Sequence, residues 1–156
     1  QRKLQLIGMD CQAFDQSSWQ VSWTTILVGA LVQYVAGTLI YGPLFGKDWL
    51  GAMNKDKGNE RWFPKNENIR YRFFGAFFLG AAESYVYGVL LNLTGAKTYL
   101  HAFQLGLIIF LGCFTPMIAS ESLWEIRPLT LIKIKAIRAA ISTIGVTLTL
   151  FWWNSG

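Results

Sequence analysis

Four long stretches of the chain consist mainly of apolar residues and carry almost no formal charge. The hydrocarbon core of a bilayer is roughly 30 Å thick, so about 20 residues are needed to cross it as a helix, and each stretch is close to that length. None of them has the polar stripe that a helix of a soluble bundle presents to water. The pattern predicts an all-α, four-helix transmembrane bundle with helices over residues 20–42, 73–95, 98–120 and 134–153.

The segments between these helices differ in length and polarity. Only Gly95, Ala96 and Lys97 lie between the second and third apolar stretches, which predicts a tight antiparallel hairpin. A polar loop of about 30 residues joins the first and second helices. Residues 1–18 are expected to form a polar N-terminal segment and residues 19–156 a single membrane domain. Because the chain starts at Gln1 rather than Met, a segment upstream of it is expected to have been removed.

Basic residues are concentrated on one predicted face of the membrane. Short loops rich in Lys and Arg stay on the side of synthesis, so both termini are expected on the exoplasmic, lumenal or intermembrane side. This topology, with contact to anionic headgroups or acidic partner surfaces, accounts for the net charge of +5 without nucleic acid. The basic face comprises Lys47, Lys55, Lys57, Arg61, Lys65, Arg70, Arg72, Arg127, Lys133, Lys135 and Arg138, whereas the opposite face has only Arg2, Lys3 and Lys97.

Three of these basic residues immediately precede the fourth helix and are expected to contact lipid headgroups. Lys133, Lys135 and Arg138 have long side chains whose apolar stems can be buried while the charged ends reach the interface. Phospholipids are therefore expected partners, and anionic species such as cardiolipin are included among them. A bound lipid is the only ligand that we expect.

The chain has few residues of the kind that hold metals or carry out catalysis. Its two cysteines, Cys11 and Cys113, lie far apart, and it has one histidine, so neither a disulfide nor a protein-built zinc or iron–sulfur site is expected. The sequence also contains no recognisable nucleophile–base set and no phosphate-binding loop. We therefore expect no enzymatic activity and no cofactor.

One carboxylate, Glu83, interrupts the second apolar stretch near its middle, and Gln33 lies near the middle of the first. The two polar side chains are therefore expected at the same depth in the membrane. Small residues fall on the same helix faces, Gly29 and Gly37 beside Gln33 and Gly80 beside Glu83. Since small residues allow two membrane helices to approach closely, we expect these two faces to meet.

Three roles remain open for Glu83. An ionised carboxylate is costly at mid-membrane, so the first expectation is a protonated Glu83 hydrogen-bonded to Gln33, Tyr34 or a hydroxyl such as that of Thr115 or Ser142. The second is a proton or ion relay, which normally requires a chain of ionisable groups. The third is a contact to a polar group of a partner subunit or lipid.

Two further carboxylates, Glu121 and Glu125, lie one turn apart beyond the third helix. Paired carboxylates can bind metals or act in acid–base catalysis. Here the basic residues Arg127, Lys133 and Lys135 follow closely, so we expect ion pairs instead.

Two loop motifs resemble those of a known family. The first runs from Tyr41 through Pro43, Phe45 and Gly46 to Trp49, and Pro43 is expected to end the first helix. The second runs from Leu123 to Leu129 and contains Glu125, Arg127 and Pro128. Together they resemble a family of small four-helix membrane proteins known as domain of unknown function 1761, over about residues 19–153, although Gly42 replaces an expected serine, the spacing before Phe45 is slightly shorter, and the region of Lys133 and Lys135 is more basic. The resemblance implies four helices and no particular activity.

Three classes of function are compatible with these features. The first expectation is a non-catalytic accessory or structural subunit of a larger integral membrane complex, with other membrane protein subunits as partners. The alternatives are a small proton- or ion-coupled transporter or channel built around Glu83, and a lipid- or quinone-binding membrane protein. The expected location is an energy-transducing membrane, best the mitochondrial inner membrane and its respiratory chain with both termini in the intermembrane space. A thylakoid or bacterial cytoplasmic membrane is the alternative.

Overall fold

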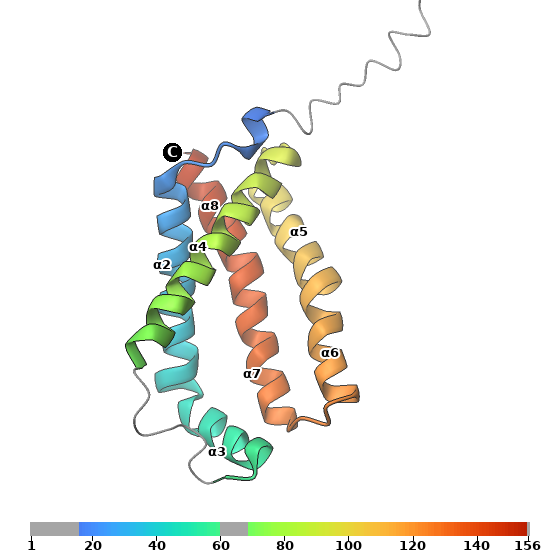
Figure 1. The fold of residues 1–156 in the computed structure, drawn as a ribbon. Coiled ribbons are helices and arrows are strands. Elements are labelled where there is room, and N and C mark those ends of the chain that lie inside the picture. The colour runs from blue at the N-terminus through green and yellow to red at the C-terminus, as the bar shows by residue number, and fades with distance from the viewer. Residues whose placement is uncertain (1–15, 60–68, 156) are drawn as a thin grey trace, which may run out of the picture.

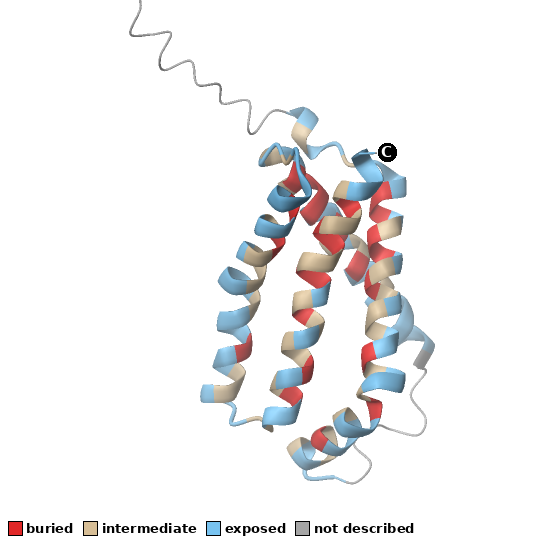
Figure 2. Cartoon of the chain, turned by 180° about the vertical axis from the view of Figure 1, so that it is seen from behind, coloured by how far each residue is buried: buried red, intermediate tan, exposed pale blue. Residues whose placement is uncertain are grey.

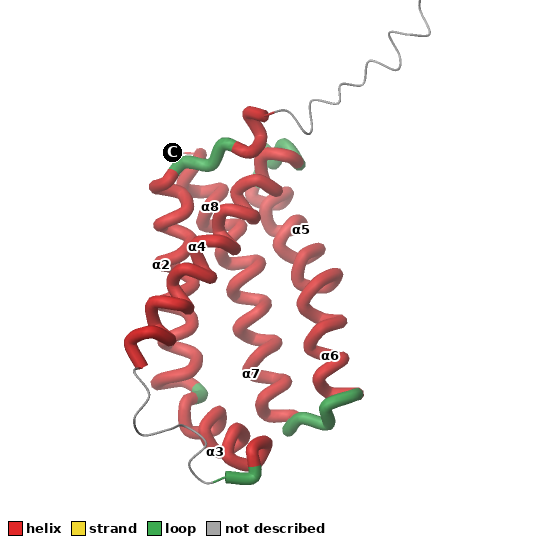
Figure 3. The backbone as a smooth tube through the Cα atoms, in the orientation of Figure 1, coloured by secondary structure: helices red, strands yellow, loops and turns green. Residues whose placement is uncertain are grey.

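The fold of the protein is that of a computed structural model, which describes residues 16–59 and 69–155. Within these ranges the chain is helical and contains no strand (Figures 1 and 3). Four helical segments are long and apolar enough to cross a membrane: Trp23–Leu44, Arg70–Leu93, Tyr99–Leu123 and Leu129–Ser155. The predicted all-α bundle with four membrane spans is therefore confirmed.

Three of the four spans contain a π-helical turn near their middle or end. A short 3₁₀ turn, η2 (Gln16–Trp19), precedes the first span. The first span is α2 (Trp23–Leu39) with the π turn η3 (Ile40–Leu44), and the second is α4 (Ile69–Leu93). The third consists of α5 (Tyr99–Ile109), η4 (Phe110–Phe114) and α6 (Thr115–Leu123), and the fourth of α7 (Leu129–Ala140), η5 (Ile141–Gly145) and α8 (Val146–Ser155).

Two spans begin at polar caps that the sequence supplies. The Ser22 side chain accepts a hydrogen bond from the Thr25 backbone N–H at the start of α2. The Thr98 side chain does the same for His101 at the start of α5. Each cap satisfies a backbone donor that has no partner within the helix, which sets where the span starts.

The segment between the first two spans corrects two predictions. Pro43 does not end the first helix at residue 42, because the chain continues through η3 to Leu44 and bends there, where the proline ring cannot follow a regular α-helix. The predicted polar loop contains a further helix, α3 (Gly46–Lys57), which Gly58 terminates in a left-handed conformation at φ 60°. The rest of that loop, residues 60–68, and most of the predicted segment 1–18 lie outside the described residues.

The fourth span also starts earlier than predicted, at Leu129 rather than residue 134. Pro128 occupies its N-cap position, and the first turns carry Lys133 and Lys135 outside the most apolar part of the chain. Lys135 pairs with Glu121 of α6, so its charge does not oppose helix formation here.

Successive spans run in opposite directions. The C-terminus, the start of α2 and the α4–α5 connection lie at one end of the bundle, which we call the terminal end (Figure 1). Helix α3 and the α6–α7 connection lie at the other end, the basic end, which carries the described basic residues of the predicted basic face. The division of charge expected from the sequence is therefore present, and the orientation in a membrane stays a prediction.

Close packing is concentrated toward the terminal end. The main buried cluster joins α4, α5 and α8 and consists of Tyr87, Leu91, Ala102, Val146 and Leu150. Elsewhere much of the helix surface is exposed (Figure 2). The span Tyr99–Leu123 is the least enclosed, with 17% of its most apolar window buried, against 39% for Leu129–Ser155. This span therefore offers the largest share of its surface to lipid or to another protein.

Candidate functional site

Helices α2 and α4 meet through small residues near mid-span. A Cβ atom at Gly29 would lie 2.5 Å from Ser84 Oγ, and one at Gly80 would lie 3.5 Å from Gln33 Cβ. The backbones of the two helices therefore approach as closely as glycine permits. The predicted meeting of these two faces is confirmed.

A hydrogen-bonded group of side chains fills this contact; we call it the mid-span cluster and define it as Gln33, Gly80, Glu83, Ser84 and Ser142. Gln33 Nε2 donates to the Gly80 carbonyl at 3.2 Å and to Ser84 Oγ at 3.3 Å. Ser142 Oγ lies 3.1 Å from Gln33 Oε1 and 3.0 Å from Glu83 Oε2. The cluster thus ties the first, second and fourth spans together.

Glu83 and Gln33 are bridged by Ser142 rather than bonded directly. Of the partners that the sequence suggested for Glu83, the described structure shows the hydroxyl of Ser142. Thr115 instead donates to the Phe110 carbonyl at 3.0 Å, across η4. Tyr34 packs its ring against Phe73 and Phe77 of α4.

The number of available protons constrains this cluster. Ser84 Oγ donates to the Gly80 carbonyl at 2.7 Å, and that carbonyl can only accept, so the Gln33 NH₂ group must face it. Gln33 Oε1 then faces Ser142, whose hydroxyl has one hydrogen and two acceptor oxygens beside it. Both contacts are hydrogen bonds only when Glu83 is protonated and donates to Ser142 Oγ, which in turn donates to Gln33.

The π turn η5 positions Ser142 toward α2 and α4. Ser142 is 5% exposed, although it lies on a helix whose neighbouring residues Ile141 and Ile144 are only partly covered. The next residue, Thr143, turns its hydroxyl back to the Ala139 carbonyl at 3.0 Å. A π turn inserts an extra residue into the helical repeat and so rotates the following face, which is a common arrangement at functional positions.

At the basic end, the predicted ion pairs of Glu121 and Glu125 are confirmed. Arg127 Nε lies 2.5 Å from Glu125 Oε2 and 3.8 Å from Glu121 Oε2, and Lys135 pairs with Glu121. The hydrogen bond to Glu125, and the charges of both carboxylates, raise the pKa of Arg127 above its ordinary value. These groups join α6 to α7, while Lys133 is exposed.

The first loop motif forms a compact corner at the basic end. The rings of Tyr41 and Trp49 lie with centroids 5.3 Å apart, and the Phe45 N–H donates to the Ile40 carbonyl at 3.0 Å. This bond closes η3 around Pro43 and directs α3 away from the first span. The functional roles suggested for these motif residues, and for Pro128 in the second motif, stay predictions.

A cavity of about 510 Å³ opens beside this corner, and the sequence did not indicate it. We call it the Arg138 cavity. Its lining comes from five elements, so no local pattern in the sequence announces it. The lining residues are Gln33, Tyr34, Gly37, Thr38, Tyr41, Gly42, Trp49, Arg72, Phe73, Ala76 and Arg138.

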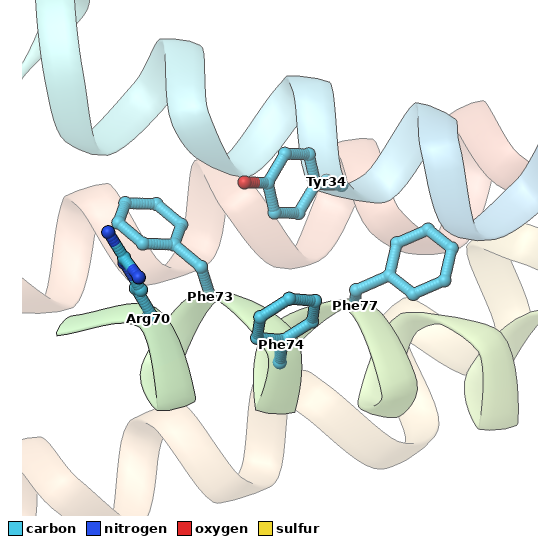
Figure 4. A pocket seen from close by; sticks show the side chains of 5 residues that line it. All are labelled: Tyr34, Arg70, Phe73, Phe74 and Phe77. Carbon is cyan, nitrogen blue, oxygen red and sulfur yellow. The ribbon is translucent and has the colours of Figure 1, made fainter. Parts of the chain in front are cut away.

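A second, aromatic groove of about 420 Å³ adjoins this cavity (Figure 4). Both share Tyr34 and Phe73, and the groove adds Arg70, Phe74 and Phe77 of α4. Figure 4 shows Tyr34 facing this row of α4 side chains.

Residues 16–59 and 69–155 contain no group of three His, Cys, Asp or Glu side chains arranged to hold a metal ion. Cys113 is a free, exposed thiol, and Cys11 lies outside the described residues.

Comparison with known proteins supports the membrane architecture. Residues 24–151 match the model of a family described as protein of unknown function, DUF1761. The chain is 29% identical over 137 residues to a UPF0591 membrane protein of Schizosaccharomyces pombe, an alignment that covers 84% of this chain and 89% of that relative. No solved structure matches the chain. With the four spans, these matches show an integral, multi-pass membrane protein.

Proposed function

The chain belongs to the DUF1761 family of membrane proteins of unknown function, and on that premise we propose that it is a non-catalytic accessory subunit of a larger integral membrane complex. The observation that carries the proposal is the exposure of the span Tyr99–Leu123, of which 17% of the most apolar window is buried. A span that contributes so little to its own bundle has most of its surface left for a neighbour.

The surface of this span has the composition of a helix contact. An exposed small-residue face runs along η4 and α6, and a Cβ atom at Gly112 would meet nothing within 4 Å. Interfaces between membrane helices are enriched in small residues because they let backbones approach. The face consists of Gly112, Cys113, Pro116, Ala119 and Ser120.

The polar groups of the described residues support a structural role rather than catalysis. Gln33 and Ser142 are engaged in holding three spans together, and Glu121 and Glu125 are engaged in ion pairs. A relay through Glu83 has one ionisable group at its centre, joined to amide and hydroxyl partners. We therefore favour the accessory-subunit role over the transporter.

We place this complex in an energy-transducing membrane, with the mitochondrial inner membrane and its respiratory chain preferred over a thylakoid or bacterial cytoplasmic membrane. The basic end would face the matrix, since basic loops stay on the side of synthesis. Other membrane protein subunits are the proposed partners, with anionic phospholipid between them.

Gentle detergent extraction followed by native gel electrophoresis tests the proposal. The chain should migrate in a species much larger than 17.6 kDa plus its detergent. Ala119→Trp should release it from that species by filling the small-residue face. Leu79→Trp, on the exposed surface of α4, is the matched control and should leave it in place. A small species for the unmodified chain, or equal behaviour of the two variants, would overturn the proposal.

A further inference from the structure

We propose that the Arg138 cavity binds the phosphate group of an anionic phospholipid from the leaflet at the basic end, with an acyl chain of that lipid lying along the adjoining aromatic groove. The site is independent of the accessory-subunit role. It rests on one cation of the fourth span, on the shape and lining of the cavity, and on the continuity between cavity and groove.

Arg138 is a cation within a membrane span that lacks a carboxylate partner among the described residues. It is half-buried and crosses from α7 toward α2, where its Nε lies 3.9 Å from the position that a Cβ atom at Gly37 would occupy. The neighbouring cations Arg127 and Lys135 both pair with carboxylates of the α6 end. A guanidinium inside the span is costly unless an anion compensates it, and a phosphate accepts its fork of N–H donors in a bidentate arrangement.

A second cation borders the same cavity from another span. Arg72 of α4 lines it opposite α7, so a phosphate placed there would lie between two guanidinium groups. Tyr41 and Trp49 complete the wall at the basic end, where aromatic side chains commonly lie at the depth of lipid headgroups. Basic pockets between spans on this side of a membrane suit anionic headgroups.

The apolar part of the proposed ligand has its own surface. The Tyr34 and Phe73 rings, with centroids 6.2 Å apart, separate the cavity from the aromatic groove, which continues along Phe74 and Phe77 (Figure 4). A volume of about 510 Å³ lies within the usual range of roughly 300 to 1,000 Å³ for ligand sites. Small residues keep the space open, since a side chain larger than Gly37 or Ala76 would project into it.

Native mass spectrometry of the purified full chain tests this site. The chain is released from nanodiscs of phosphatidylcholine that contain a minority of phosphatidylglycerol, and the lipids retained by the protein are identified. We expect one retained phosphatidylglycerol per chain. Retention should fall about tenfold or more in Arg138→Gln, the loss expected for a charge-assisted contact. Lys133→Gln removes an exposed charge of the same helix and should retain the lipid.

Two further arms separate the other outcomes. Ala76→Phe leaves every charge in place and fills the cavity, so it should also abolish retention. For the unmodified chain, phosphatidylglycerol should raise the thermal unfolding temperature more than phosphatidylcholine or oleate does, a measurement that needs no variant to fold. Equal losses in Arg138→Gln and Lys133→Gln would indicate non-specific charge attraction and overturn the site. Equal effects of phosphatidylcholine or oleate would overturn the phosphate as its ligand.

Discussion

The two ends of the bundle are built from the same four apolar spans but pack differently. At the terminal end, α4, α5 and α8 enclose a buried cluster around Leu150 and Val146. At the basic end, the spans surround the Arg138 cavity and are joined by ion pairs between α6 and α7. Since all four spans are apolar over their length, hydrophobicity alone does not explain the difference.

Glycine placement accounts for much of it. Toward the terminal end, glycines lie at helix contacts, and a Cβ atom at Gly106 would come within 2.8 Å of Ile144 Cα. Toward the basic end, Cβ atoms at Gly42, Gly75 and Gly112 would meet nothing within 4 Å. The same residue type thus permits close approach at one end and leaves open surface at the other. The mid-span cluster lies where these two regimes meet.

The largest expected effect comes from replacing the carboxyl group at that boundary. Glu83→Lys should prevent assembly or cost about 3 kcal/mol, because it places an ammonium group at mid-span beside Ser142. Glu83→Gln keeps the shape and a donor for Ser142, so its stability should lie within about 0.5 kcal/mol of the unmodified chain. Thermal unfolding in detergent measures both. If Glu83→Gln instead abolishes a pH-dependent ion flux in liposomes, the relay role replaces the structural one.

A comparison of two glycines on one span tests the difference between the ends directly. Gly106→Ala should destabilise by about 2 kcal/mol, since its new methyl group would meet the backbone of the fourth span at Ile144 and at the Thr143 carbonyl. Gly112→Ala should be neutral or stabilising by up to about 1 kcal/mol, because alanine favours the helix and the space is empty. Thermal unfolding of the pair decides the point, and similar losses in both would contradict it.

The bridge between the first, second and fourth spans should have a smaller effect. Ser142→Ala leaves Gln33 Oε1 without its donor and is expected to cost about 1 kcal/mol, in the range measured for hydrogen bonds between membrane helices. Thr149→Ala is the control, because Thr149 donates only to the Gly145 carbonyl of its own helix, at 2.8 Å. A Ser142→Ala variant as stable as Thr149→Ala would show that the bridge adds little to packing.

The ion pairs of the basic end should have the smallest effect. Arg127→Ala is expected to cost at most about 1 kcal/mol, because Glu125 is half-exposed and water screens the pair. The loss should shrink as salt is added, since exposed charges are screened within about 8 Å at physiological ionic strength. Unfolding temperatures at low and high salt measure this, with exposed Lys133→Ala as control. A salt-independent loss would point to packing of the arginine side chain instead.

Some corrections to the sequence prediction had local signals that favoured them. The helix α3 has Asp48 in its first turn, Lys55 and Lys57 in its last, and Gly58 at its end, which is the charge and cap pattern of a helix. Its polarity made it resemble a loop. The early start of α7 depends on the pairing of Lys135 with Glu121, residues separated by 14 positions, and no local pattern shows that pairing.

The sequence by itself determined the four spans, their alternation and the two unequal faces of charge. These features follow from local physics, because a span in lipid must satisfy its backbone hydrogen bonds within its own helix. It also indicated that Gln33 and the small residues of α2 would face α4.

Only the tertiary structure decided which side chains meet between spans. It placed Ser142 between Gln33 and Glu83, and it brought Arg138 across to Gly37 beside a cavity lined by five elements. The rotation and bend of each span decide such contacts, and three π turns alter both. In spans that are apolar on every side, hydrophobic pattern does not specify that rotation, so the fit of small and polar side chains against their neighbours sets it.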